Sequence, residues 1–529
     1  MPESEPIESY ALLGDIQTAA LVSATGSIDW LCVPRFDSSA CFAALLGDKE
    51  NGHWRIAPAG ATKCSRRSYD GDTLVLHTEW ETSEGAVRVI DFMPLRGEAP
   101  DVVRIVEGLS GRVEMSCELR IRFDFGALVP WVRRIDGGFS ATGGPDSVYV
   151  RTPVNLEGRD FAHVATFAVS KGDRVPFVLT WQAGHLPPPD EVDAEAALAE
   201  ALDYWRDWAA PCTYDGEWRD AVVRSLITLK ALTYSPTGGV VAAATTSLPE
   251  ALGGDRNWDY RYCWLRDASM TLQGFVYAGY RDEARAWREW LLRAIGGDPR
   301  LLRIMYGLGG ERRLAEQELD HLAGYADSTP VRIGNAASDQ RQLDVYGEIL
   351  DTLHLDRCSG LSPEDDAWSM QLGMLDFLES IWSEPDRGLW EMRGDPQHYV
   401  HSKVMAWAGF DRAVRGVEAF GFDGPVDRWR AIRDEIHADI CKNGYDEKRN
   451  TFTQSYGSKA LDAAALLIPQ VGFLPGDDPR IVGTIDAVQN ELLDDGFLRR
   501  YDNSDTKDGF DSEEAASSSA PSGSPTRYI

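Results

Sequence analysis

The sequence predicts a multidomain protein with a β-rich N-terminal third and a helical remainder. Its 529 residues exceed the usual size of one domain. Short segments rich in Val, Ile, Thr and aromatic residues, separated by Gly, Pro or Asp, fill the first third. From Trp218 onward, apolar residues recur with the period of an α-helix. We therefore expect a β domain over residues 1–190, a linker helix over 191–211 and a helical domain over 212–504.

The β domain is predicted to be an antiparallel, sandwich-like structure. Its first part, "GDIQTAALVSATGSIDWLCVPRFDSSACFAALLGD", predicts two short strands joined by a turn at Gly26, then a loop and a short helical piece. Several later segments alternate polar and apolar residues, as half-buried strands do. The predicted strands are 73–80, 86–93, 101–109, 113–125, 147–152 and 177–183.

A run of three prolines, Pro187–Pro189, ends the last of these strands. The predicted linker helix begins near Val192 and carries apolar residues on one face. Nine helical segments follow: 218–234, 264–279, 282–295, 340–355, 365–382, 398–420, 426–442, 459–471 and 480–493. Residues 505–529, "DTKDGFDSEEAASSSAPSGSPTRYI", have almost no apolar content, and we expect a disordered tail.

Charge and cysteine content exclude several classes of partner. The 84 acidic and 53 basic residues give a net charge of −31, which repels nucleic acid and anionic membranes. The eight cysteines are scattered without CxxC spacing, as in proteins of a reducing compartment. The acidic first residues lack a long apolar run, so we expect no secretory signal, and we expect no membrane-spanning segment. We expect a cytoplasmic protein without a cofactor or a metal, and its oligomeric state stays open.

The first stretch that could contribute residues to a binding or catalytic site is "GGDRNWDYRYCWLRDASMT", Gly253–Thr271. Arg266 and Asp267 open a predicted helix directly after Trp264. Asp at a helix start has an ordinary explanation, which is capping. An Arg–Asp pair among aromatic residues also fits a pocket that binds sugar hydroxyls, and both explanations stay open. The 17 tryptophans of the chain suit sugar binding too, although many belong to cores.

The second stretch is "GNAASDQRQLDVYGEILD", Gly334–Asp351, with Gln342, Asp344 and Glu348. Glu348 could be a catalytic carboxylate, but we expect it to be an ordinary residue of a helix surface. The chain has no GxSxG elbow, no P-loop and no GxGxxG loop. Carboxylates among aromatic residues remain, and these are the tools of glycoside hydrolysis.

The third stretch, "PDRGLWEMRGDPQHYVHSKVMAWAGFDRA", places Glu391 between Trp390 and Met392 before a helix. Aromatic surroundings keep a carboxyl group protonated near neutral pH by desolvation. His398 and His401 have HxxH spacing, but no third ligand of the usual type lies nearby in the sequence, so we expect no zinc site.

With these motifs in this order, nearly the whole chain resembles glycoside hydrolase family 15, the glucoamylase-like enzymes, and within it the bacterial branch that includes trehalases. The matching segments are the Gly14–Asp48 stretch, "NWDYRYCWLRDAS", "RIGNAASDQRQLDVYGEILD" and "GLWEMRG…HYVHSKVMAWAGFDRA". The resemblance implies a β supersandwich, a linker helix and an (α/α)6 barrel, and removal of an α-linked glucose with inversion. It implies that Glu391 is the general acid. The substrate-binding residues that it implies are Trp264, Arg266, Asp267, Gln342, Asp344, Trp390 and Lys403.

The resemblance also implies a general base in a late motif similar to "EEYD", which this chain lacks. "LRRYDNSDTKDGFDSEE", Leu498–Glu514, matches the segment that precedes the family's tenth helix, and the chain then continues "AASSSAPSGSPTRYI". We therefore expect an incomplete barrel with about nine of its twelve helices, no general base and weak or no activity. A frameshift, a premature stop or a shortened natural variant would each produce this pattern.

Trehalose is the first expected substrate, because the motifs resemble the trehalase branch and the chain is expected to be cytoplasmic. Hydrolysis of malto-oligosaccharides is the alternative within the family. The alternative without catalysis is a carbohydrate-binding remnant that holds glucose through Arg266 and Asp267 and does not hydrolyse a substrate.

Overall fold

The computed structural model describes residues 5–360 and 365–502. The described chain divides into two compact units. The β unit takes the chain up to Tyr262, together with Tyr277–Tyr280 and Glu316–Gly334. The helical unit takes Cys263–Val276, Arg281–Ala315 and the chain from Asn335. The predicted tail, residues 505–529, lies outside the described residues.

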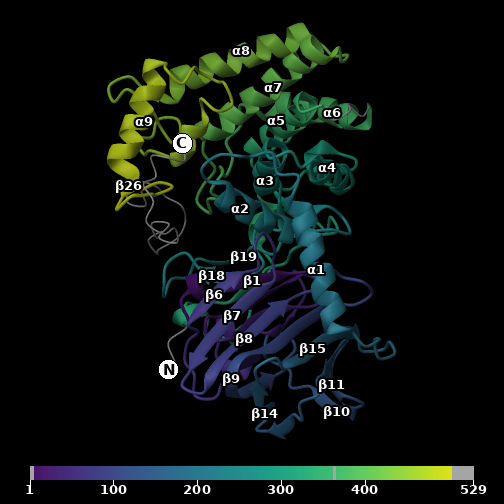
Figure 1. Ribbon diagram of the computed structural model, residues 1–529. Helices are drawn as coiled ribbons and strands as arrows, with labels where there is room; N and C mark the ends of the chain where they lie inside the picture. Colours follow the sequence, from purple (N-terminus) through teal and green to yellow (C-terminus); the bar gives the residue numbers. More distant parts are fainter. Residues whose placement is uncertain (1–4, 361–364, 503–529) are drawn as a thin grey trace. The chain divides into compact units, whose positions relative to one another are not determined.

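Fifteen strands of the β unit form one connected antiparallel sheet system (Figure 1). The main path runs β1-β2-β3-β5-β9-β15-β12-β11-β10. The strands are β1 (Ala11–Gly14), β2 (Ala19–Val22), β3 (Ser27–Cys32), β4 (Ala40–Phe42), β5 (His53–Pro58), β6 (Arg66–Tyr69), β7 (Leu76–Thr82), β8 (Gly85–Phe92), β9 (Asp101–Arg120), β10 (Trp131–Ile135), β11 (Gly138–Gly143), β12 (Asp146–Arg151), β13 (Glu157–Arg159), β14 (Ala162–Ser170) and β15 (Arg174–Ala183).

The predicted strand pair around Gly26 is confirmed as β2 and β3, followed by the short 3₁₀ helix Ala44–Leu46. The prediction of two strands at 101–109 and 113–125 is wrong, because the single strand β9 runs without a break through the first and into the second, and ends at Arg120. The first half of β9 pairs with β8 and β15, and the second half pairs with β5 and β14. Gly108 does not mark a turn. It lets β9 pass close to the end of β14, since a Cβ there would lie 2.1 Å from the carbonyl oxygen of Ser170.

The core of the β unit is mainly apolar, and a fully buried ion pair lies within it. Arg104 and Asp91 are fully buried, with Nε and Oδ1 2.7 Å apart. The same guanidinium donates to the carbonyl oxygens of Trp54 and Gly26. A buried charge is tolerated only with such complete pairing.

Two helices and a returning segment complete the β unit. The predicted linker helix is confirmed as α1 (Ala194–Ala209), which Asp193 caps and whose Ala197 and Ala201 pack on the sheet. Helix α2 is Arg219–Ala231. The segment Glu316–Gly334 returns to this unit from later in the chain and contributes Leu322, Tyr325 and Val331 to a cluster around Trp30.

The helical unit is built from α3–α9. Their bounds are α3 (Leu265–Tyr277), α4 (Arg281–Ile295), α5 (Asp344–Cys358), α6 (Asp365–Ile381), α7 (Val400–Phe420), α8 (Val426–Asn443) and α9 (Pro479–Leu492).

The remaining strands of the two units form short pairs, which are β16–β17 (Thr233–Tyr234, Gly239–Val240), β18–β19 (Thr246–Pro249, Asn257–Asp259), β20–β21 (Cys263–Trp264, Met305–Tyr306), β22–β23 (Gln317–Glu318, Arg332–Ile333), β24–β25 (Tyr445–Asp446, Thr451–Phe452) and β26–β27 (Leu493–Asp494, Phe497–Leu498).

Burial separates inner from outer helices in this unit. α5 and α7 are buried on almost every side, whereas α4 and α8 bury one apolar stripe each. The prediction of a helix over 459–471 is wrong, because only the 3₁₀ turn Ala463–Leu467 forms there, capped by Asp462. None of the helices in the described ranges is both long enough and apolar enough to cross a membrane.

The inner helices α5 and α7 approach each other closely at two glycines. A Cβ on Gly347 would lie 2.1 Å from the backbone oxygen of Met405, and one on Gly409 would lie 2.9 Å from Cδ1 of Leu350 in α5. Only the absence of side chains allows this approach. It fixes the start of α5 against the start of α7, which carry the polar residues considered next.

Candidate active site

The site in the helical unit begins where β20 meets α3. Trp264 ends the strand, and Arg266 and Asp267 lie in the first turn of the helix. Trp264 and Arg266 are both largely buried, whereas the Asp267 side chain is 44% exposed. Arg266 Nη2 lies 3.4 Å from Asp267 Oδ2. The predicted Arg–Asp pair thus exists, with its carboxylate open to solvent.

Glu391 lies against this pair, in a turn between α6 and α7. Trp264 Nε1 donates to Glu391 Oε1 at 2.6 Å, and Arg266 Nη2 lies 3.6 Å from the same oxygen. Arg266 Nη1 also donates to the carbonyl oxygen of Leu389 at 3.0 Å. The structure therefore brings Trp264, Arg266, Asp267 and Glu391 together from positions more than 100 residues apart in the sequence.

The backbone of Glu391 is left-handed, with a φ of 59°. A residue with a Cβ adopts this conformation only where its surroundings enforce it. Gln340 Nε2 donates to the Glu391 carbonyl oxygen at 3.2 Å and so holds the turn from the side of α5. Gln340 is a contact that the sequence does not signal, because it lies in an irregular segment before the helix.

Burial raises the pKa of Glu391, and the Arg266 guanidinium and the hydrogen bond from Trp264 oppose that rise. The side chain keeps 22% of its surface exposed, so a ligand can reach the carboxyl group. A carboxyl group with these two opposing influences can hold a proton and release it to a bound substrate.

Two further carboxyl groups, Asp344 and Glu348, lie one turn apart on the inner helix α5. Both are buried, and burial raises the pKa of Asp344 to about 7 and that of Glu348 to about 8. The charge of Arg266 lowers both pKa values. The expectation that Glu348 is an ordinary surface residue is therefore wrong: α5 lies inside the unit, so it has no solvent-facing side at this position.

Two buried side chains near the start of α7, His401 and Lys403, differ in their hydrogen-bond partners. His401 is buried, with no hydrogen-bond partner at either ring nitrogen among the described residues, and burial together with the charge of Arg266 lowers its pKa to about 3. The Lys403 ammonium donates to the carbonyl oxygens of Trp382 and Glu384 at the end of α6. Lys403 thus ties α7 to α6, while His401 lies within the electrostatic reach of Arg266.

Gln342 and Trp390 complete the predicted set. Gln342 Nε2 donates to Gln340 Oε1 at 3.4 Å, so it supports the residue that holds the Glu391 backbone. Trp390 Nε1 donates to Asp462 Oδ1 at 2.9 Å. Sequence reasoning missed Asp462, since its segment was expected to be a regular helix.

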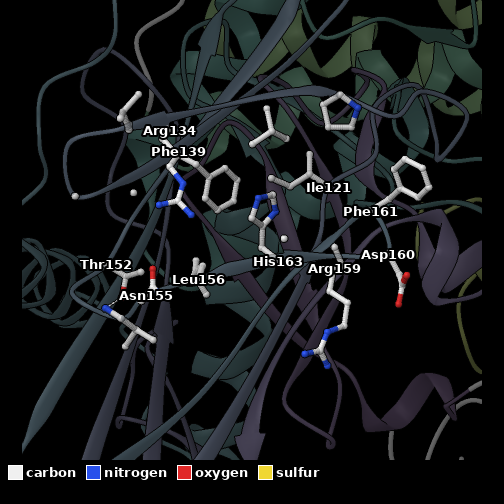
Figure 2. Close-up of a pocket in the computed structure, with 18 of the residues that line it drawn as sticks. Ile121, Arg134, Phe139, Thr152, Asn155, Leu156, Arg159, Asp160, Phe161 and His163 are labelled. Atoms are coloured by element: carbon white, nitrogen blue, oxygen red, sulfur yellow. Dashed lines mark hydrogen bonds between the residues drawn. The ribbon is translucent and has the colours of Figure 1, made fainter.

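A separate hollow of about 980 Å³ lies in the β unit, among β10–β14 (Figure 2). Its wall includes the stacked rings of Phe139 and His163, with centroids 3.8 Å apart, and the side chains of Arg134 and Arg159. None of the predicted site residues lines it. The carboxyl groups of Glu391, Asp344 and Glu348 therefore do not belong to this hollow.

Comparison with known proteins agrees with this chemistry. The family model "Glycosyl hydrolases family 15" matches residues 216–518, and "Trehalase-like, N-terminal" matches residues 2–205. A trehalase of Mycobacterium tuberculosis is 39% identical, with 96% of this chain and 79% of that protein covered. A trehalase of Thermoplasma acidophilum is 36% identical, with 91% of this chain and 84% of that protein covered.

Among solved structures, a bacterial glucoamylase complexed with acarbose has a similar fold, with a TM-score of 0.69 at 13% identity. The match covers 94% of this chain and 81% of that one. The expected arrangement of a β domain followed by a glucoamylase-like helical domain is thereby confirmed. The family model, the identities and the fold agree: the chain belongs to glycosyl hydrolase family 15 and is a trehalase-like glycoside hydrolase.

Proposed function

We propose that this protein hydrolyses an α-linked glucoside with inversion, with trehalose as its first substrate and Glu391 as the proton donor. The observation that carries the proposal is the buried Glu391 carboxyl group with Trp264 Nε1 at 2.6 Å and Arg266 beside it. The trehalose assignment is supported by the curated relatives, among them the two trehalases at 39% and 36% identity.

In the proposed reaction, protonated Glu391 donates its proton to the glycosidic oxygen as the bond to the leaving sugar breaks. Burial raises the pKa of Glu391 and so favours the protonated form before the reaction. Arg266 and Asp267 would bind hydroxyl groups of the terminal glucose, with Trp264 as a wall of the pocket. Arg266 is suited to this because its other nitrogen is fixed to the Leu389 carbonyl oxygen.

Inversion also needs an ionised carboxylate, about 6.5–9.5 Å from the acid, to activate water. Asp344 and Glu348 suit that role poorly, since burial raises their pKa values to about 7 and about 8 and so works against the ionised form that a base needs. We assign no general base among the described residues. Gln342, Asp344 and Trp390 remain proposed supports of the sugar pocket, and we now propose a structural role for Lys403.

The proposal is tested by incubating the purified chain with trehalose and, separately, with maltose, and by following glucose and its anomer by NMR. Inversion should release one β-glucose, from the attacked sugar, and one α-glucose, from the leaving sugar, so we expect both anomers in equal initial amounts from trehalose, and little product from maltose. Glu391→Gln is the inactive comparison. Glucose from maltose alone would reassign the enzyme to malto-oligosaccharides. Glucose binding by calorimetry without any product would leave the carbohydrate-binding alternative, and the measured rate tests the expected impairment.

We extend the proposal to a cytoplasmic location. All eight cysteines are free thiols, four of them buried, as is usual in a reducing compartment. The proposed partner is a small carbohydrate substrate.

A further inference from the structure

The indole of Trp390, the residue before Glu391, is held at its edge by a buried carboxylate. Trp390 Nε1 donates to Asp462 Oδ1 at 2.9 Å, and Asp462 is only 6% exposed. The Arg500 guanidinium carbon lies 5.3 Å from the centroid of the same indole, over its face. The ring is therefore fixed both in its plane and from one side.

Asp462 is itself fixed by three further contacts. Its Oδ1 accepts from the backbone N–H of Ala464 at 2.8 Å, and its Oδ2 accepts from Gln454 Nε2 at 3.3 Å. Its backbone forms a β-bridge with Tyr501. These contacts position the carboxylate independently of Trp390.

This contact acts on a strained turn. A left-handed backbone is strained for a residue with a Cβ, which favours relaxation to another conformation. Glu391 therefore stays left-handed, at φ 59°, only while its neighbours are held. Arg266 holds the Leu389 carbonyl oxygen, Gln340 holds the carbonyl oxygen of Glu391, and Asp462 holds the side chain of Trp390.

We propose that Asp462 is a positioning residue for the proton donor: through Trp390 it keeps the Glu391 turn left-handed and its carboxyl group against Trp264 and Arg266. The proposal rests on the assignment of Glu391 as the acid. Asp462 does not touch the reacting atoms. When its hydrogen bond is removed, the turn is free to relax and the carboxyl group moves away from Trp264 Nε1.

The placement is tested without turnover, because Trp264 reports where the carboxyl group lies. In protein labelled with 5-fluorotryptophan, the ¹⁹F signal of Trp264 is assigned by its loss in Trp264→Phe. We expect Asp462→Ala to shift or broaden that signal. Trp390→Phe, which removes the same hydrogen bond from its other end, is expected to do the same, and Asp462→Asn, which keeps an oxygen acceptor, to change it less.

Asp478→Ala is the matched control. Asp478 also caps a helix start in the helical unit, where it accepts from the Arg480 N–H at 2.9 Å. We expect that variant to lose some thermal stability without moving the Trp264 signal. An unchanged Trp264 signal in folded Asp462→Ala and Trp390→Phe would overturn the proposal.

The kinetic comparison uses two substrates that differ in their need for a proton. Trehalose needs the acid, whereas the fluoride of α-glucosyl fluoride departs with little protonation. We expect Asp462→Ala to lower kcat on trehalose by about 10²-fold, the cost of misplacing a catalytic group by about 1 Å, and kcat on the fluoride by only a few-fold.

Equal losses on both substrates would mean general damage and would contradict a positioning role. Glu391→Gln separates the two proposals: if it leaves trehalose turnover intact, the acid assignment fails. The ¹⁹F measurement still decides in that case whether Asp462 places Glu391.

Discussion

At the scale of single residues, Trp264 and Arg266 oppose the effect of burial on the pKa of Glu391. Burial favours the protonated acid, while Trp264 and Arg266 favour the carboxylate. Burial thus shifts Glu391 towards its protonated form, and the two side chains limit that shift. Changing either partner should therefore move the pH dependence of the reaction as well as its rate.

We predict that Trp264→Phe shifts the alkaline limb of the pH–kcat profile on trehalose to higher pH by about one unit or less. The protonated acid is the active form, so kcat falls as pH rises through the pKa of Glu391. Losing the hydrogen bond at 2.6 Å destabilises the carboxylate and raises that pKa. Trp429→Phe, at a buried tryptophan of α8, is the control, and a limb moving to lower pH would contradict the prediction.

The raised pKa of Glu348 leads to a prediction about the pH dependence of stability. Its pKa is raised from 4.5 to about 8 by burial, so the folded protein binds a proton that the unfolded chain releases between those values. Stability is then highest below about pH 4.5 for this group and falls as pH rises towards 8. We expect Glu348→Gln to gain about 1–3 kcal/mol relative to the wild type between pH 5 and pH 8.5.

This gain is measured by urea unfolding at the two pH values. The control is Glu289→Gln, at an exposed position of α4, which should leave the pH dependence as it is. A Glu348→Gln variant whose stability follows the wild type at both pH values would show that Glu348 is ionised in the folded protein.

At the scale of elements, the closeness of α5 and α7 determines which residues meet. Gly347 lies between Asp344 and Glu348 on α5, and the Cβ that it lacks would overlap the α7 backbone at Met405. The contact leaves no space for adjustment, because the obstacle is backbone and not a flexible side chain.

We predict that Gly347→Ala destabilises the protein by about 2 kcal/mol or more, since the helices would have to separate. Gly274→Ala is the matched control: Gly274 is in α3, and a Cβ added there would meet no surrounding atom within 4 Å, so alanine should be neutral or stabilising by up to about 1 kcal/mol. Urea unfolding at pH 7 measures both. Equal stability of Gly347→Ala and the wild type would contradict the close packing.

Much of this could be predicted from local pattern, and the failures have physical causes. Helix periodicity located α3–α9 to within a few residues, and alternation located most of the strands. The 459–471 segment has helical apolar spacing, yet its chain is held by the bonds of Asp462 to Trp390 and Gln454, which no local pattern encodes. Glu348 was misassigned because an inner helix carries polar residues only where a site needs them.

The candidate site shows the same limit. The identities of Glu391, Arg266 and Trp264 could be inferred from motifs and resemblance, because their local context is distinctive. Their supports, Gln340 and Asp462, have ordinary neighbours in the sequence and become recognisable only when distant segments meet. Residues that hold a catalytic turn are therefore harder to predict than the residues in it.

At the scale of the whole molecule, the dominant feature is a net charge of −31. Like charges on one surface repel and reduce the stability of the compact state, and added salt screens them. We predict that the melting temperature at pH 8 rises by a few degrees between 10 mM and 300 mM NaCl. At pH 5, where carboxylates begin to take up protons, the rise should shrink. A melting temperature that falls with salt at pH 8 would mean that favourable ion pairs outweigh the repulsion.

The segment Glu316–Gly334 has a consequence for the order of events during synthesis. It belongs to the β unit, where Tyr325 and Val331 cover the cluster around Trp30, but the ribosome makes it only after α3 and α4. The cluster around Trp30 therefore cannot be completed when residue 262 emerges. We expect it to be completed only once residue 334 has been made, after synthesis of the first helices of the other unit.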